Sequence, residues 1–308
     1  MRNLLRRFLA LRLEEAIAVL FFIPMVYLTS RAYFYFLVRD QMPTRIRGDW
    51  QRIWVTIGVF LLFWLVIKIK KSWRVLRDWL PFGFCIAIYT NLHDTVHFAN
   101  QNDVQHWLIK IDDWLFGVQP CVWAQQFITP TFTDIFIAAY ANYFVLVIVV
   151  ALVLYFMKRY QEFRYTLVST IICYYIGYFL FVIFPAAPPR LVLQSMFTVT
   201  LQGQHLNTIK DAILTASSSR GAFPSLHCAV SFVSLFFAWR YIKWLFWVML
   251  PAVILLIVST VYLRHHYVID LIAGLFLGVF AFWIGPKMED WWNGLRVKAS
   301  PQIGNPRL

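Results

Sequence analysis

Two histidine-containing stretches carry the residue types best suited to chemistry. In Arg264-His-His-Tyr-Val-Ile-Asp270, His266 and Asp270 are four residues apart. On a helix this spacing places both on one face, so the carboxylate can accept a hydrogen bond from one ring nitrogen and leave the other basic. A histidine held in this way can attack phosphorus and form a phosphohistidine intermediate. A polar pair that only caps a helix end is the alternative interpretation.

The second stretch is Arg220-Gly-Ala-Phe-Pro-Ser-Leu-His227. Pro224 suits the first turn of a helix, and Ser225 would offer its hydroxyl and backbone N–H near the positive end of that helix. A phosphoryl group bound there would meet these donors. His227, one turn further on, could protonate a leaving oxygen or activate an acceptor. Together the two stretches offer a nucleophile and an acid/base.

Phosphoryl chemistry also requires positive charge, because the phosphoryl oxygens must be stabilised in the transition state. Arginine suits this role, since its guanidinium can hold two phosphate oxygens at once. Three arginines are candidates: Arg190, which ends Pro185-Ala-Ala-Pro-Pro-Arg190, then Arg220 and Arg264. No grouping of acidic residues and histidines in these loops resembles a two-metal site. We therefore expect metal-independent chemistry without a cofactor.

The rest of the chain must hold these residues at a membrane. Of its 308 residues, 60% are hydrophobic and only 14% are charged, which is typical of a polytopic membrane protein. Several apolar runs of about twenty residues are long enough to cross ~30 Å of hydrocarbon. We expect an all-α integral membrane bundle of about eight transmembrane helices. The expected spans are 16–37, 53–69, 79–98, 135–157, 165–184, 224–242, 244–263 and 267–285.

The positions of Lys and Arg predict the orientation of this bundle. Residues 1–15, 68–78, 158–164, 240–243 and the C-terminal tail hold 18 of the 28 basic residues. They should be cytoplasmic, both termini included, so both histidine stretches should face the periplasmic, extracellular or lumenal side. The formal charge of +13 lies in short blocks between apolar runs. It therefore indicates topology and attraction to anionic lipid, and not nucleic-acid binding.

The pattern of apolar runs and basic connections also divides the chain into four parts. We expect N-terminal transmembrane helices at 1–100, an extracytoplasmic loop at 101–134, a catalytic transmembrane core at 135–286 and a cytoplasmic tail at 287–308. Within the loop, apolar residues from Val104 to Phe116 recur at near-helical spacing and suit a helix lying in the membrane interface. A helix packed over the bundle ends is the alternative.

The two histidine stretches and Arg190 resemble the signature motifs of the type 2 phosphatidic acid phosphatase superfamily of membrane lipid phosphatases and phosphotransferases. The matches are Arg190, then Pro224 with Ser225 and His227, then His266 with Asp270. The resemblance implies that His266 is the nucleophile, Asp270 its partner and His227 the acid/base. It implies phosphate binding by Arg190 and Ser225.

The motifs also depart from the commonest pattern in places. Ile183 stands where the first motif has lysine, Leu191 follows Arg190 in place of proline, and Ser259-Thr260 replaces Ser-Arg. Tyr262-Leu-Arg-His-His-Tyr267 and Asp113-Trp-Leu-Phe-Gly-Val-Gln-Pro120 instead resemble the branch related to the inositol phosphorylceramide synthases.

The resemblance implies phosphoryl chemistry on a lipid phosphate or phospholipid. If water accepts the phosphoryl group, the protein is a phosphatidate or polyprenyl phosphate type of phosphatase; if a hydroxyl accepts, it is a phosphotransferase similar to sphingolipid headgroup synthases. The synthase-like motif forms favour transfer. The alternative of another class is a non-catalytic lipid-binding or transport protein. Against it, the expected spans lack helices broken by Gly or Pro at matching places in two halves.

Other polar and small residues have weaker signals. His93 and His97, with Asp94, have a spacing that can bind metal, but no third ligand is evident. Gly274 and Gly278 should pack tightly against another helix. Tyr140 and Tyr143 are expected to serve helix packing, with contact to a polar headgroup as the alternative. Four cysteines without metal-ligand spacing give neither a disulfide framework nor a redox site.

Overall fold

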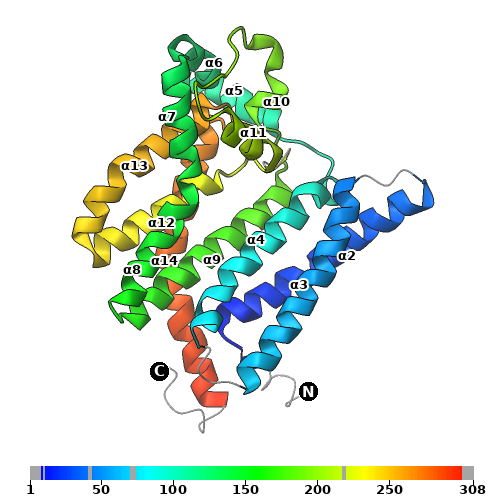
Figure 1. The fold of residues 1–308 in the computed structure, drawn as a ribbon, viewed down its shortest axis with the longest axis vertical. Helices are drawn as coiled ribbons and strands as arrows, with labels where there is room; N and C mark the ends of the chain where they lie inside the picture. The colour runs from blue at the N-terminus through cyan, green and yellow to red at the C-terminus, as the bar shows by residue number, and fades with distance from the viewer. Residues whose placement is uncertain (1–7, 10, 41–43, 70–73, 217–219, 300–308) are drawn as a thin grey trace. The chain divides into compact units, whose positions relative to one another are not determined.

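The computed structural model describes residues 8–9, 11–40, 44–69, 74–216 and 220–299. Within these ranges, the side chains of 44–45, 59–60, 62–69, 74, 90–95, 97–98, 215–216 and 299 lie outside the described part. The chain divides into two compact units, Met1–Gln101 with Asp290–Leu308, and Asn102–Glu289. Their described residues form helices and loops (Figure 1), with one isolated bridge between Ala186 and Gly221. The predicted all-α fold is confirmed.

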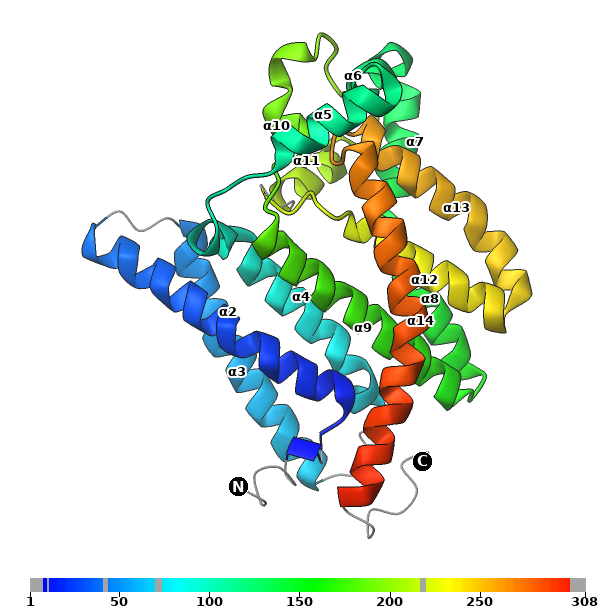
Figure 2. The same ribbon diagram turned by 180° about the vertical axis from the view of Figure 1, so that it is seen from behind.

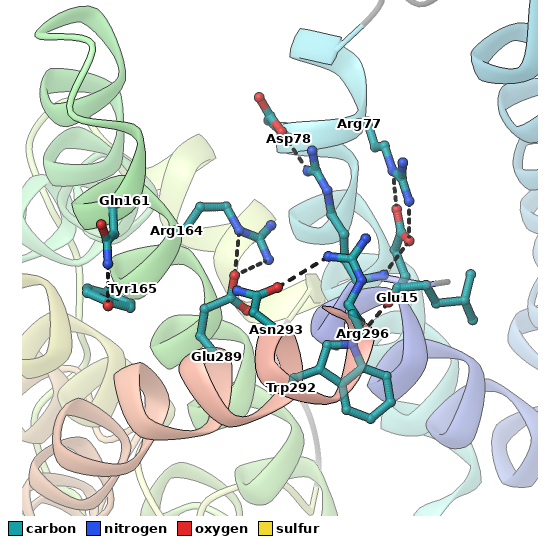
Figure 3. Close-up of polar contacts among 12 residues, drawn as sticks. Glu15, Arg77, Asp78, Gln161, Arg164, Tyr165, Glu289, Trp292, Asn293 and Arg296 are labelled. Carbon is teal, nitrogen blue, oxygen red and sulfur yellow. Dashed lines mark hydrogen bonds and ion pairs between the residues drawn. The ribbon is translucent and has the colours of Figure 1, made fainter. Parts of the chain in front are cut away.

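The first unit contains three long helices, α2 (Leu13–Val38), α3 (Thr44–Ile69) and α4 (Arg74–Ala99), which pack against one another. Ion pairs join α4 to the start of α2. Arg12 Nη1 lies 2.6 Å from Asp78 Oδ1. Arg77 Nε lies 2.6 Å from Glu15 Oε1 (Figure 3).

The predicted polar group of His93, Asp94 and His97 falls on α4, but these three side chains lie outside the described residues. Its role stays a prediction.

The second unit holds the candidate site. Its helices are α5 (Gln105–Phe116), α6 (Pro120–Trp123), α7 (Pro130–Ala141), α8 (Tyr143–Phe156), α9 (Tyr160–Ile183), α10 (Pro189–Val192), α11 (Asn207–Ala216), α12 (Leu226–Tyr241), α13 (Lys243–Tyr262) and, as far as Glu289, α14 (Val268–Ala299), with 3-10 turns η2 (Ala124–Phe127) and η3 (Gln194–Met196). Helix α12 packs against α8, α9 and α13. It is therefore surrounded by apolar helices. The helix predicted over Val104 to Phe116 is present as α5.

Two glycines bring α14 against α12. A Cβ atom added at Gly274 would lie 2.5 Å from the Ser225 carbonyl oxygen, and one added at Gly278 would lie 2.6 Å from the Ala229 carbonyl oxygen. Only glycine permits so close an approach between two backbones. The expected tight packing of these glycines is confirmed, and it ties α14 to the end of α12 that carries His227.

Several helices can span a membrane. Among the described residues, α2, α9, α13 and the Val268–Lys298 part of α14 are long and apolar enough, and α7 with α8 makes a fifth span if the pair, bent by 40°, is counted as one. The chain is therefore an integral membrane protein. The spans expected at 53–69, 79–98 and 224–242 fall on helices α3, α4 and α12, which are not among these candidate spans, so the total of eight spans stays a prediction.

The basic connections of the second unit lie away from the histidine stretches. Arg159, between α8 and α9, donates from Nη1 to the Tyr241 carbonyl oxygen at the end of α12, at 3.0 Å. Arg164 Nη2 pairs with Glu289 Oε1 at 2.9 Å (Figure 3). His227 follows directly on the beginning of α12 and His266 follows the end of α13, so both lie at the opposite ends of these helices.

Candidate active site

The three predicted catalytic residues come together where α12 begins, α13 ends and α14 begins. His266 Nδ1 lies 3.3 Å from Asp270 Oδ2, and His266 Nε2 lies 3.4 Å from His227 Nδ1. Asp270 and His266 are buried and His227 is half-buried. A carboxylate, a central imidazole and an outer imidazole thus form one line.

The chain turns sharply before His266. Arg264 has a φ of 64°, in the left-handed region, and this ends α13. The backbone N–H groups of His265 and His266 both donate to the Thr260 carbonyl oxygen, at 2.8 and 3.2 Å. Helix α14 begins only at Val268. The predicted pairing of His266 with Asp270 is therefore present, but His266 precedes the helix instead of sharing one of its faces.

Ser225 joins the beginnings of α12 and α14. Its hydroxyl oxygen accepts from Cys228 N at 3.4 Å as the N-cap of α12, and its backbone N–H donates to the Asp270 carbonyl oxygen at 3.0 Å. The side chain is fully buried, and the Phe223–Pro224 peptide bond just before it is cis. The backbone N–H expected to bind phosphate thus donates within the protein, and the hydroxyl oxygen accepts from Cys228.

Arg190 contributes positive charge near His265 and His266. Its backbone N–H donates to the Arg264 carbonyl oxygen at 2.9 Å. Burial lowers the pKa of His266 to about 3, and the positive charge of Arg190 acts in the same direction, while a hydrogen bond with the Ala222 backbone opposes them. The imidazole of His266 is therefore neutral at neutral pH, which is the protonation state that a nucleophile requires.

The other two predicted arginines are held by neighbouring loops. Arg220 Nη1 lies 2.9 Å from Asp103 Oδ1. Arg264 donates from Nη2 to the Val199 carbonyl oxygen at 2.6 Å, and its guanidinium carbon lies 3.8 Å from the Phe197 ring centroid. Of the three arginines, Arg190 is the one whose positive charge helps to lower the pKa values of His265 and His266.

Aromatic rings surround the histidines. Tyr140 stacks on His265 with ring centroids 4.6 Å apart, and its ring lies 4.7 Å from that of His227. The ring of Tyr143 lies 4.6 Å from His227, and its hydroxyl is 2.7 Å from the Tyr174 hydroxyl. Helix packing is the role that the sequence predicts for Tyr140 and Tyr143, whereas the position of His265 among these rings emerges only from the fold.

Asp112 of α5 is a further residue that the sequence analysis passed over. It is buried, and its carboxylate accepts hydrogen bonds from Val268 and Ile269 at the beginning of α14. The available signal was an acidic residue four positions after Leu108, on the apolar face of a helix that was predicted from its periodicity.

The described part of the chain contains no group of three or more His, Cys, Asp or Glu side chains that could hold a metal ion. Its four cysteines are buried and form no disulfide.

The segment of the chain that contains these residues also matches a known protein family. Residues 106–284 match the PAP2 superfamily, and this range includes the whole of the Asp270–His266–His227 line. The chain belongs to the PAP2 superfamily. A PA-phosphatase related-family protein of Dictyostelium discoideum is 31% identical over 130 residues, which is 41% of this chain and 24% of that relative. No solved structure matches the chain. The predicted superfamily of membrane phosphatases is confirmed, while the synthase-like branch stays a prediction.

Proposed function

We propose that this PAP2 superfamily member transfers a phosphoryl group from a lipid phosphate or phosphodiester through a phosphohistidine on His266. The observation that supports this most directly is the line of Asp270, His266 and His227. Asp270 holds Nδ1 of His266, so Nε2, which lies 3.4 Å from His227 Nδ1, is the nitrogen that would attack phosphorus.

The reaction then has two balanced halves. In the first, His266 Nε2 forms a bond to phosphorus, the bond from phosphorus to the leaving oxygen breaks, and His227, which enters this half as the imidazolium, donates a proton to that oxygen and becomes neutral. In the second, His227 takes a proton from water or a hydroxyl group, whose oxygen attacks phosphorus as the P–N bond breaks. Both histidines return to their starting states.

Phosphate binding is assigned first to Arg190, whose charge acts on His265 and His266. Arg220 and Arg264 would contribute only if substrate displaced Asp103 or the Val199 carbonyl oxygen. Ser225 would act by holding the start of α12 against Asp270. Redirecting Arg220 or Arg264 would be costly, because each guanidinium is already held by the partner named above.

The orientation in the membrane and the choice of acceptor belong to the same proposal. The basic connections at Arg159 and at the end of α12 would be cytoplasmic, with both termini on that side and the histidines at the extracytoplasmic leaflet. The motif forms Tyr262 to Tyr267 and Asp113 to Pro120 favour a hydroxyl acceptor, as in inositol phosphorylceramide synthases, over water. The choice depends on how well the bound phosphohistidine is shielded from water.

The test is release of phosphate or of a new phospholipid from a panel of lipid phosphates and phospholipids. Purified protein in detergent with EDTA is compared with His266→Ala and with His205→Ala, a control whose side chain is exposed. We expect turnover by the wild type and the control and none by His266→Ala. An acid-labile, base-stable phosphoryl label should be trapped on the wild type only.

Free phosphate as product would identify a phosphatase, and a new phospholipid would identify a transferase. An active His266→Ala variant would refute the phosphohistidine assignment. A wild type inactive on the whole panel with hydroxyl acceptors present would favour the lipid-binding or transport alternative.

A further inference from the structure

Helix α5 carries a carboxylate that reaches the first turn of α14, 156 residues further along the chain. Asp112 Oδ2 accepts from Val268 N at 2.8 Å, and Oδ1 accepts from Ile269 N at 2.9 Å. In Figure 2, α5 crosses over the beginning of α14. The first amides of a helix have no partner inside the helix, so Asp112 acts as their cap from a distant segment.

These amides belong to the segment that separates the nucleophile from its partner. Residues 267, 268 and 269 are the only ones between His266 and Asp270. Tyr267 N donates to Asp270 Oδ2 at 3.0 Å, and the next two amides donate to Asp112. Every backbone N–H of the intervening segment is therefore held by one of two carboxylates.

Burying a carboxylate for this purpose is costly. Asp112 is 1% exposed, and a buried charge destabilises a protein unless hydrogen bonds compensate it. Burial raises the pKa of Asp112, and its bonds to Val268 and Ile269 oppose that change. A neutral acceptor could hold these amides at lower cost, as the Thr260 carbonyl oxygen does for His265 and His266, whereas the carboxylate of Asp112 gives each amide an oxygen of its own.

The negative charge also affects where a phosphate can bind. A helix N-terminus attracts anions through its exposed N–H groups and its dipole. At the beginning of α14 these groups are already taken by Asp112 and Asp270. Phosphate is therefore directed to the other side of His266, towards His227 and Nε2.

From this geometry we infer that Asp112 is a positioning residue for phosphoryl transfer. It fixes the turn between His266 and Asp270, so that Nε2 of His266 is aimed at the bound phosphorus. The inference rests on the proposed function and adds to it a residue from outside the matched catalytic motifs.

The experiment compares Asp112→Asn with Asp113→Asn. Asparagine has the shape of aspartate but one acceptor oxygen, and its NH2 group would face a backbone N–H. Asp113 is the exposed neighbour and undergoes the same change of charge. The substrate is the lipid phosphate or phospholipid that the wild type turns over fastest, and kcat, KM and the thermal unfolding midpoint are measured for each protein in EDTA.

We expect kcat of Asp112→Asn to fall roughly 10- to 100-fold, because a misplacement of about 1 Å has that effect on a reaction rate. KM should stay within about twofold, since the phosphate-binding side is unchanged. Asp113→Asn should match the wild type. Asp112→Glu, which keeps both oxygens, should recover part of the lost kcat.

Equal kcat values for Asp112→Asn and Asp113→Asn, with His266→Ala inactive, would overturn the inference and leave the proposed function intact. A purely structural role would also overturn it. In that case Asp112→Asn would lower the unfolding midpoint and regain wild-type kcat when normalised to folded protein, and the larger Glu would be worse than Asn. If His266→Ala were active, the proposed function itself would fail.

Discussion

Gly274→Ala tests whether the contact between α12 and α14 sets the geometry of the histidine pair. The added Cβ would lie 2.5 Å from the Ser225 carbonyl oxygen and 3.1 Å from Cys228 Cβ, whereas ordinary contact begins at 3.4 Å. Because the closest atom belongs to the backbone, the helices must separate by about 0.9 Å, since close-packed interiors leave no free space. His227 lies in the first turn of α12 and His266 lies just before α14, so the contact between the two helices lies between the two histidines.

The expected loss of activity follows from that separation of the two helices. The 3.4 Å between His266 Nε2 and His227 Nδ1 would lengthen beyond hydrogen-bonding distance. We expect kcat to fall roughly 10- to 100-fold. Overpacking costs about 1–3 kcal/mol, partly offset by about 1 kcal/mol from the better helix propensity of alanine, so the folded protein should still be obtained.

The assay is turnover in detergent with EDTA, together with the thermal unfolding midpoint. Gly278→Ala is the first comparison, because its Cβ would meet the Ala229 carbonyl oxygen at 2.6 Å, one turn further from the histidines. It should lose similar stability and less activity. Gly294→Ala is the control, since nothing lies within 4 Å of its Cβ. Full activity in Gly274→Ala, or equal activity losses in Gly274→Ala and Gly278→Ala, would refute the reasoning.

Further predictions concern charge and protonation. Asp270→Asn should lower kcat by on the order of 10²- to 10⁴-fold at unchanged protein stability, and a loss below tenfold in steady-state kinetics would contradict its role. Arg190→Lys should lower kcat/KM by about tenfold or more because bidentate contact is lost, whereas Arg220→Lys should have a small effect because its partner is Asp103; the reverse order would contradict this assignment. Because burial lowers the pKa of His266 below its ordinary 6.5, the imidazole stays neutral as pH falls, and the acid limb of the kcat/KM profile should lie below pH 6; an acid limb at 6.5 would contradict the burial argument. Turnover should be unchanged after dialysis against EDTA, and restoration of activity only by added divalent metal would contradict metal-independent chemistry.

The amino-acid sequence by itself determined the features that depend on nearby residues. Apolar runs predicted the helices because a membrane-spanning helix must be apolar along its own length. The four-residue spacing of His266 and Asp270, with the Pro-Ser-x-His pattern at His227, identified the candidate chemistry. These features depend on residues a few positions apart in the sequence, or on short motifs that members of a family share.

Only the tertiary structure decided which residues meet across long distances in the chain. Asp112 caps α14, Tyr140 stacks on His265, and Arg220 pairs with Asp103. It also placed His266 ahead of α14, since the left-handed Arg264 turns the chain before the helix begins. Such pairings depend on how whole helices pack, and neither periodicity nor charge count encodes the partner of a buried side chain. The sequence therefore indicated His266 as the proposed nucleophile, and the packing of α5, α12 and α14 revealed how this histidine is held.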